Sequence, residues 1–196
     1  MPDEPAAPPL TVPLMNPGTL ITIAPAAGPI GHLLRTAIDS EQVGATRLHL
    51  PADQPDLETA ITALREQTKL IITCDDDLNP VAGIDVIASD FTDVVVPERA
   101  DLPTVVAEVA HLVSAHPVGI SICGRGAAAL PALLAALAAG GHVWVEAPEY
   151  ETAASSGHPG PVRDHVALVA RASGLARIAG RPPLDGHAAR VLLGLT

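Results

Sequence analysis

The chain has 196 residues, a formal charge of −11, and 48% hydrophobic but only 2% aromatic residues. This length is most simply one domain with a core of alanine, valine, leucine and isoleucine. The acidic balance argues against nucleic acid, which requires clustered lysine and arginine, and against anionic membranes.

The N-terminus and the cysteines indicate the compartment. The first residues lack the basic and apolar regions of a secretory signal, and no uncharged apolar run reaches the ~20 residues of a membrane helix. Cys74 and Cys123 end different predicted strands. A disulfide between them is conceivable, but free thiols are the favoured state in a reducing compartment. We therefore expect a cytoplasmic protein.

Taken in order, the chain alternates strand-like and helix-like segments after a tail. Residues 1–18 are proline-rich and lack periodicity, which predicts a flexible tail before a single domain at 19–196. Helical spacing predicts helices from Ile30 to Gly44, from an N-cap at Asp56 to Gln67, and from Asp101 or Thr104 onward. A further apolar helix follows the glycine turn that ends at Gly126 and runs to about Ala139. The predicted strands are Thr19–Ala24, Thr46–Leu50, Lys69–Thr73, Ile84–Ala88, Thr92–Val96, Val118–Cys123 and His142–Glu146.

The segment from Pro117 to Tyr150 is the most regular βαβ unit. A strand runs into a glycine turn at Gly124-Arg125-Gly126, an apolar helix follows, and a second strand ends at Glu146. The carboxyl ends of parallel strands meet at the edge where α/β proteins keep their sites. We therefore expect Arg125 and the segment that begins at Glu146 to lie close together.

Several stretches of this sequence resemble one family. They are TLITIAPAAG, GATRLHLPAD, the CGRG turn, GGHVWVEAPEY and the closing PVRDHVALVARASGLARIAGRPPLDGHAARVLLGL. Together they are similar to the β-keto acid cleavage enzymes, the family of 3-keto-5-aminohexanoate cleavage enzyme. The similarity covers both ends of the chain and little of its middle.

The resemblance implies a (β/α)8 TIM-type barrel with parallel strands and outer helices. A complete barrel usually needs ~250 residues, and the shortage here falls between Cys74 and Pro117. We therefore expect an abbreviated barrel, which is either shortened in the middle or open and closed against another subunit.

The resemblance also implies a metal-dependent reaction between a β-keto acid and acetyl-CoA. The family binds a divalent metal, usually zinc, through the two histidines of an HxH motif and a loop glutamate, and a loop aspartate acts as the base. A metal with an open position would stabilise enolate-like charge. His49 matches the first histidine, whereas Pro51 stands at the second.

The loop after the last strand departs further from the family. The glutamate ligand falls on Pro148, the aspartate base on Glu149, and the arginine of GGHVR on Trp144. His49 and Glu146 remain as candidate metal ligands, with Glu149 and Arg125 as candidate catalytic residues. Asp53 and Asp75–Asp77 could complete a weaker Mg²⁺ or Mn²⁺ site, or His49 is a structural remnant beside a solvated acidic loop.

The turn Gly124-Arg125-Gly126 has three readings. With Glu146 about twenty residues on, it fits a dinucleotide fingerprint. Alternatively, Arg125 and the amides at the helix start hold an anion such as a carboxylate or a CoA phosphate. The glycines could also serve only a tight turn.

We therefore expect a divergent member of the family whose metal site is largely lost, non-catalytic or altered, and homo-oligomeric. The alternatives are an active acyl-transferring enzyme with rearranged ligands, which would take a keto acid or CoA ester, a partner subunit of a full-length homologue, and an NAD(P)-binding module.

Overall fold

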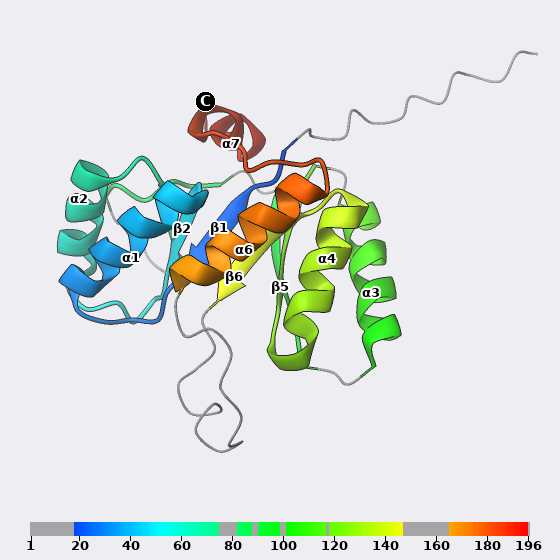
Figure 1. Cartoon of the computed structure of the whole chain (residues 1–196). Helices are drawn as coiled ribbons and strands as arrows, with labels where there is room; N and C mark the ends of the chain where they lie inside the picture. The colour runs from blue at the N-terminus through cyan, green and yellow to red at the C-terminus, as the bar shows by residue number, and fades with distance from the viewer. Residues whose placement is uncertain are drawn as a thin grey trace, which may run out of the picture.

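The computed structural model describes residues 18–74, 82–87, 90–98, 101–116, 118–146 and 165–195. Strands and helices alternate along these ranges (Figure 1). The elements are β1 (Ile21–Ala24), α1 (Ile30–Val43), β2 (Arg47–Leu50), α2 (Leu57–Gln67), β3 (Ile71–Cys74), β4 (Thr92–Val96), α3 (Leu102–Ala115), β5 (Ile120–Gly124), η1 (Gly126–Ala128), α4 (Ala129–Ala139), β6 (His142–Glu146), α6 (His165–Ile178) and α7 (Gly186–Leu192).

The strands form one six-stranded parallel sheet in the order β3-β2-β1-β6-β5-β4. The steps from β1 to β3 and from β4 to β6 cross the sheet in the same direction. Right-handed crossovers then place the connecting helices on one face, as in a barrel, whereas a doubly wound dinucleotide-binding sheet reverses its direction. The sheet is a curled half-barrel, and the predicted abbreviated TIM-type barrel is confirmed.

The face of the sheet under the helices is apolar. Ile23, Leu48 and Ile72 occupy paired positions on β1, β2 and β3 and belong to the core under α1, α2 and α6. Ile120 and Ile122 of β5 pack in a second core with α3 and α4. Because side chains alternate along a strand, the opposite face takes the polar residues between them. The half-barrel therefore has a polar interior.

Helix α7 covers the amino ends of the strands (Figure 1). Its Ala189 packs with Leu20 and Phe91, and the ring of His142 stacks on Phe91 with centroids 5.8 Å apart. The backbone N–H of Leu20 donates to His142 Nδ1 over 3.0 Å. Burial, with a smaller effect of the Arg181 guanidinium, lowers the pKa of His142 to about 3. His142 is therefore a neutral, structural residue.

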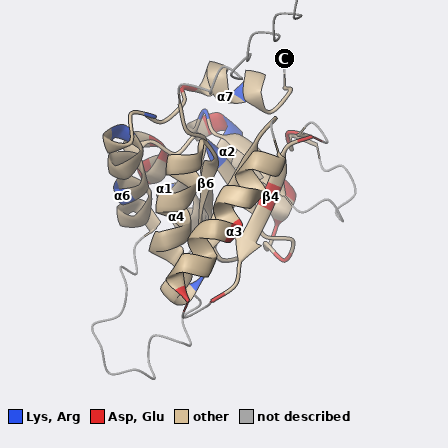
Figure 2. Cartoon of the chain, turned by 90° about the vertical axis from the view of Figure 1, so that its right-hand side faces the viewer, with Lys and Arg blue, Asp and Glu red and all other residues tan. Residues whose placement is uncertain are grey.

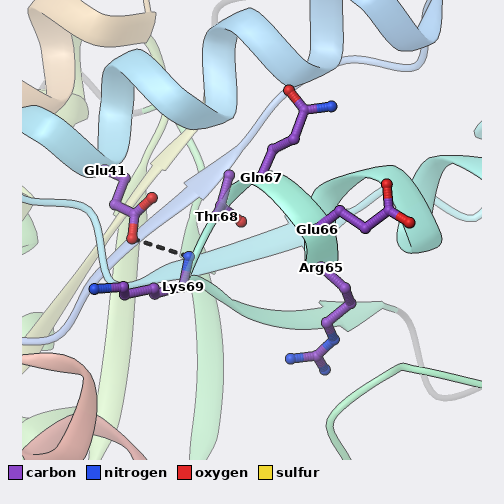
Figure 3. Close-up of a pocket in the computed structure, with 6 residues that line it drawn as sticks. All are labelled: Glu41, Arg65, Glu66, Gln67, Thr68 and Lys69. Carbon is purple, nitrogen blue, oxygen red and sulfur yellow. Dashed lines mark hydrogen bonds between the residues drawn. The ribbon is translucent and has the colours of Figure 1, made fainter.

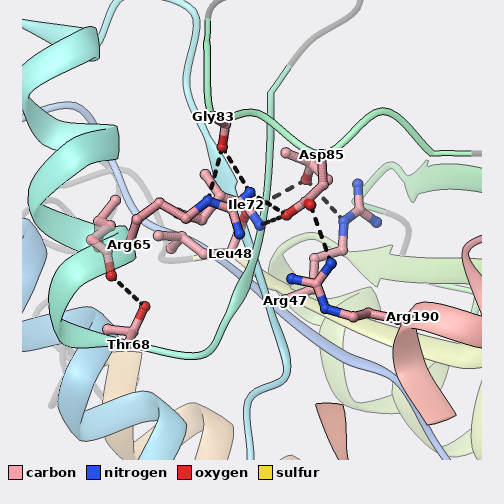
Figure 4. Close-up of polar contacts among 10 residues, drawn as sticks. Arg47, Leu48, Arg65, Thr68, Ile72, Gly83, Asp85 and Arg190 are labelled. Atoms are coloured by element: carbon pink, nitrogen blue, oxygen red, sulfur yellow. Dashed lines mark hydrogen bonds and ion pairs between the residues drawn. The ribbon is translucent and has the colours of Figure 1, made fainter. Parts of the chain in front are cut away.

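The predicted strand at Ile84–Ala88 is not formed in its described part, residues 84–87, so that prediction was wrong there, and the part of the chain that the structure describes has six of the seven predicted strands. The N–H of Asp85 donates to the Ile72 carbonyl over 2.7 Å, but the Ile72 N–H donates to the Asp85 carboxylate over 2.9 Å. The Asp85 carboxylate thus accepts the hydrogen bond from the Ile72 N–H that the carbonyl of a neighbouring strand would otherwise accept. The same carboxylate binds Arg65 and Arg190 at 2.6 and 3.4 Å (Figure 4).

An ion pair spans the interior between strands that are not neighbours in the sheet. Arg47 of β2 donates two hydrogen bonds to the Asp93 carboxylate of β4, at 2.8 and 2.6 Å, and a third to Thr73 Oγ1 at 2.9 Å. The Arg47 side chain is only 2% exposed. Contact between β2 and β4 requires the sheet to curl. The pair therefore links the two ends of the half-barrel where no backbone pairing of β3 with β4 joins the described strands.

Other expectations have mixed outcomes. Both cysteines are free, as expected. Asp56 precedes α2 but has a left-handed backbone, and its side chain makes no capping bond, so the N-cap prediction was wrong in its chemistry. Among the helices of the described ranges, none has the length and apolarity to cross a membrane. The predicted tail lies outside the described residues, Gly18 excepted.

Candidate functional site

The candidate site lies at the carboxyl ends of the strands, on the polar face of the sheet. We call this edge the mouth and define it by His49, Cys123, Arg125, Trp144 and Glu146. These residues come from β2, β5, β6 and the turn after β5. The mouth thus contains the predicted candidates His49, Arg125 and Glu146, whereas Glu149 lies outside the described residues.

His49 is held in place by its neighbours. It is 9% exposed, and its Nδ1 lies 3.2 Å from Thr73 Oγ1, which also accepts a hydrogen bond from Arg47. Its ring is tilted against the Trp144 indole, with ring centroids 5.2 Å apart. Pairing of His49 with Thr73 in the β2–β3 register explains the first contact. The imidazole is therefore fixed from two sides.

Arg125 and Glu146 form a bidentate ion pair. Arg125 Nε and an Nη atom donate to the two carboxylate oxygens over 2.9 and 3.0 Å. The pairing of Ile122 with Val143 brings the ends of β5 and β6 alongside each other. The expected proximity of these residues is confirmed. Because both oxygens of Glu146 are engaged by Arg125, the carboxylate can serve another cation only if this ion pair is broken or shared.

Cys123 is a mouth residue that was expected to be a free thiol or a disulfide partner and was not predicted as a site residue. Its Sγ lies 3.9 Å from a Glu146 oxygen. Burial and the negative charge of Glu146 raise the pKa of the Cys123 thiol to about 12. The thiol is therefore protonated at neutral pH, which disfavours a role as a thiolate nucleophile.

Comparison with known proteins gives one result for this fold and mouth. A sequence model of the beta-keto acid cleavage enzyme family matches residues 84–195, more than half of the chain. The chain belongs to this family. The match includes Arg125, Trp144 and Glu146, but it begins at residue 84 and so does not include His49. No curated protein matches the sequence.

The described residues do not fit the metal that the family implies. No three His, Cys, Asp or Glu side chains in the described ranges gather closely enough to hold an ion. His49, Asp53 and Glu146 therefore do not form a metal site by themselves, and Glu146 is paired with Arg125. Asp75–Asp77, Pro148 and Glu149 lie outside the described residues.

The glycine turn has a structural reason for each of its glycines. A Cβ at Gly124 would clash with the backbone of Ala128 in η1. Gly126 has a φ of +54°, and a Cβ there would overlap the Glu98 carboxylate. A carboxylate thus already lies against the turn, where a phosphate would have to displace it. Anion binding by Gly124, Arg125 and Gly126 stays a prediction, and the negative charge of the Glu98 carboxylate disfavours it.

A surface depression of about 490 Å³ lies away from the mouth (Figure 3). It is lined by Glu41 and by residues 65–69, between the end of α2 and the amino end of β3. A Glu41 oxygen accepts a hydrogen bond from the Lys69 N–H over 3.0 Å. No predicted site residue lines it, so we keep the mouth as the candidate site.

Proposed function

We propose that this family member binds a β-keto acid at the mouth and does not retain the metal-dependent cleavage with acetyl-CoA. The observation that carries the proposal is the state of the expected ligands. His49 is present, Pro51 and Pro148 stand where two further ligands belong, and the neighbouring Glu146 is bound by Arg125. A proline side chain has no atom that can ligate a metal.

The chemistry of the remaining groups supports binding without efficient cleavage. A catalytic zinc site keeps three protein ligands, and the metal stabilises charge that develops on the substrate oxygen. Without a metal, stabilisation of that charge depends on hydrogen-bond donors and on Arg125, the cation that the described mouth contains. Arg125 is half exposed, so a carboxylate from solvent can reach it.

Metal analysis and a turnover assay test this function together. The full chain, purified without chelators and dialysed, should contain far less than one equivalent of zinc or manganese per chain. It should show no steady turnover of acetoacetate or longer β-keto acids with acetyl-CoA.

The controls are two histidine variants. One equivalent of retained metal that is lost in His49→Ala, but kept in His111→Ala on the exposed face of α3, would contradict the proposal. Turnover that requires His49 would instead support the reading as an enzyme with rearranged ligands.

We also propose that two copies of the chain associate through the outer face of α3 and α4. This α3–α4 face exposes Leu102, Val106, Leu130 and Leu134, each between 45% and 58%. The two helices lie side by side and are mostly free of the colours that mark charged residues (Figure 2). Spacing of four residues places each pair in one row on its helix. Glu108 is the one charged residue in the two helices.

The scarcity of charge on this face makes it the surface where a second copy of this acidic chain meets least repulsion. The chain carries a formal charge of −11, so two copies repel each other overall, and apolar burial at the contact has to outweigh that repulsion. A two-fold axis would place the uncharged α3–α4 face against itself, which is the common arrangement of homodimers. A basic partner would bind to acidic side chains elsewhere on the molecule, because α3 and α4 contain only Glu108.

The mass in solution tests this association. Light scattering after size exclusion should give twice the chain mass, and Leu134→Glu should give a monomer with unchanged circular dichroism. The matched control is Ile178→Glu, which changes an 85% exposed residue of α6 and should stay dimeric. A monomeric wild-type chain at micromolar concentration would contradict the proposal.

A further inference from the structure

A short segment, residues 83–87, covers the outer edge of β3, and we call it the strap. β2 occupies the other edge of β3. On the outer edge, the Ile72 carbonyl accepts a hydrogen bond from the Asp85 N–H over 2.7 Å, and the Ile72 N–H donates to the Asp85 carboxylate over 2.9 Å. The strap therefore occupies the place of a neighbouring strand, although a carboxylate replaces one of that strand's carbonyl oxygens.

Two arginines hold the strap in this place (Figure 4). Arg65 of α2 donates two hydrogen bonds to the Gly83 carbonyl, at 3.0 and 2.7 Å, and one to the Asp85 carboxylate at 2.6 Å. Arg190 of α7 lies 3.4 Å from the other Asp85 oxygen. The Asp85 side chain is 12% exposed, whereas neighbouring Val86 is 78% exposed. The polar contacts of the strap thus converge on Asp85.

The edge strand at the opposite end of the sheet, β4, has no comparable cover. Among the described residues, its backbone exchanges hydrogen bonds with β5 alone. The Thr92 N–H donates to the Gly119 carbonyl, and parallel pairing uses every second residue, so the N–H groups of Asp93 and Val95 point away from β5. Four of the five residues of β4 are only partly buried. Such an edge, with the β-forming sequence TDVVV, is suited to pairing with another strand.

We propose that Asp85 and the strap prevent β3 of one copy of the chain from pairing with β4 of a second copy. All six strands are parallel, so β4 of a second copy could continue the sheet beyond β3 in the same direction. That contact would join two different surfaces, and repeating it would produce open assemblies. Because β4 is open in every copy, the cover on β3 decides whether they form. The inference is independent of the association through the α3–α4 face.

The mass in solution of an Asp85→Ala chain tests the inference. Every chain compared carries Leu134→Glu, so that the α3–α4 face does not contribute, and Leu134→Glu alone is the parent. Asp85→Ala frees the Ile72 N–H and releases both arginines. Light scattering should give a mass that rises with concentration to at least twice that of the parent. The matched control is Asp39→Ala on the exposed face of α1, which changes the net charge equally and should keep the mass of the parent.

A proline in β4 identifies the strand that pairs. Val95→Pro removes an N–H that points away from β5 and leaves the hydrogen bonds to β5 in place, so this variant alone should keep the circular dichroism of the parent. Combined with Asp85→Ala, it should restore the mass of the parent. Hydrogen exchange gives a second readout, because the Asp93 and Val95 amides should exchange more slowly in the associated Asp85→Ala chain than in the parent.

Three outcomes overturn the inference. The first is an Asp85→Ala chain that keeps the mass of the parent at every concentration. The second is association that Val95→Pro does not reduce, which would show unspecific aggregation. The third is a monomer in which the Asp93 and Val95 amides become protected, because β4 of the same chain would then occupy the edge. If circular dichroism shows that Asp85→Ala does not fold, Arg65→Gln decides by the same measurements, since it releases the strap and retains Asp85.

Discussion

Burial of neutral His142 should make the stability of this protein fall in mild acid. The ring lies inside the amino end of the half-barrel, where it accepts a hydrogen bond from Leu20 and stacks on Phe91. Its pKa is about 3 in the folded protein against 6.5 for a free histidine. As the pH falls below 6.5, the unfolded chain binds this proton and the folded chain does not, so protonation favours unfolding.

The size of the effect follows from the separation of the two pKa values. The contribution is fully present above pH 6.5 and is lost progressively as the pH falls towards 3. One pH unit inside this window corresponds to about 1.4 kcal/mol, so His142 should remove about 2 kcal/mol of unfolding free energy between pH 6.5 and 5.

Urea unfolding followed by circular dichroism at several pH values measures this slope. His142→Asn retains a side-chain acceptor for the Leu20 N–H and cannot titrate. This variant should be less stable at pH 7.5, because it is smaller, but its stability should fall by about 2 kcal/mol less between pH 6.5 and 5. Other titrating groups contribute equally to both proteins and cancel in the difference.

Exposed His111 provides the control for the loss of one imidazole, and His111→Asn should keep the wild-type slope. If wild type and His142→Asn lose stability in parallel as the pH falls, His142 is not buried in its neutral form and the reasoning is refuted.

Three further predictions concern the contacts that hold the half-barrel together. Asp93→Asn should destabilise the fold by about 3 kcal/mol in urea unfolding, because it leaves the buried Arg47 charge without its carboxylate; an effect below 1 kcal/mol would show that the pair is not buried. Asp85→Asn should speed hydrogen exchange at the Ile72 amide, with distant β5 amides unchanged as the internal reference. Gly126→Ala should cost about 1–2 kcal/mol in thermal unfolding because of its positive φ, and wild-type stability would contradict that backbone geometry.

Much of the fold could be predicted because its local patterns agree with its global packing. Strand residues such as Ile23 and Leu48 face helices on one side, and the bounds of each of the six strands were predicted to within two residues. The proximity of Arg125 and Glu146 followed from parallel pairing alone. Predictions succeeded where each residue's environment is set by neighbours along the chain or on the next strand.

The missed features depend on contacts between distant segments. The alternation in residues 84–87 is typical of a strand, but the Asp85 side chain takes the donor that pairing would use. Arg47 lies in an apolar strand and is 46 residues from Asp93, so its partner cannot be read from spacing. The position of the Glu98 carboxylate against Gly126 could not be predicted either, because the glycine pattern indicates that space is needed but not which group occupies it.

The seam between β3 and β4 is the place where no backbone pairing joins the two ends of the described sheet. The number of strands can therefore change there without a change in the candidate site. The residues of the mouth come from β2, β5, β6 and the adjoining turn, and β1 fixes the spacing of β2 and β6 through its own hydrogen bonds. Extra βα units added at the seam would widen the ring and part Arg47 from Asp93, yet leave those pairings untouched. Lineages could thus gain or shed strands at this one junction while selection altered the ligand-binding edge independently.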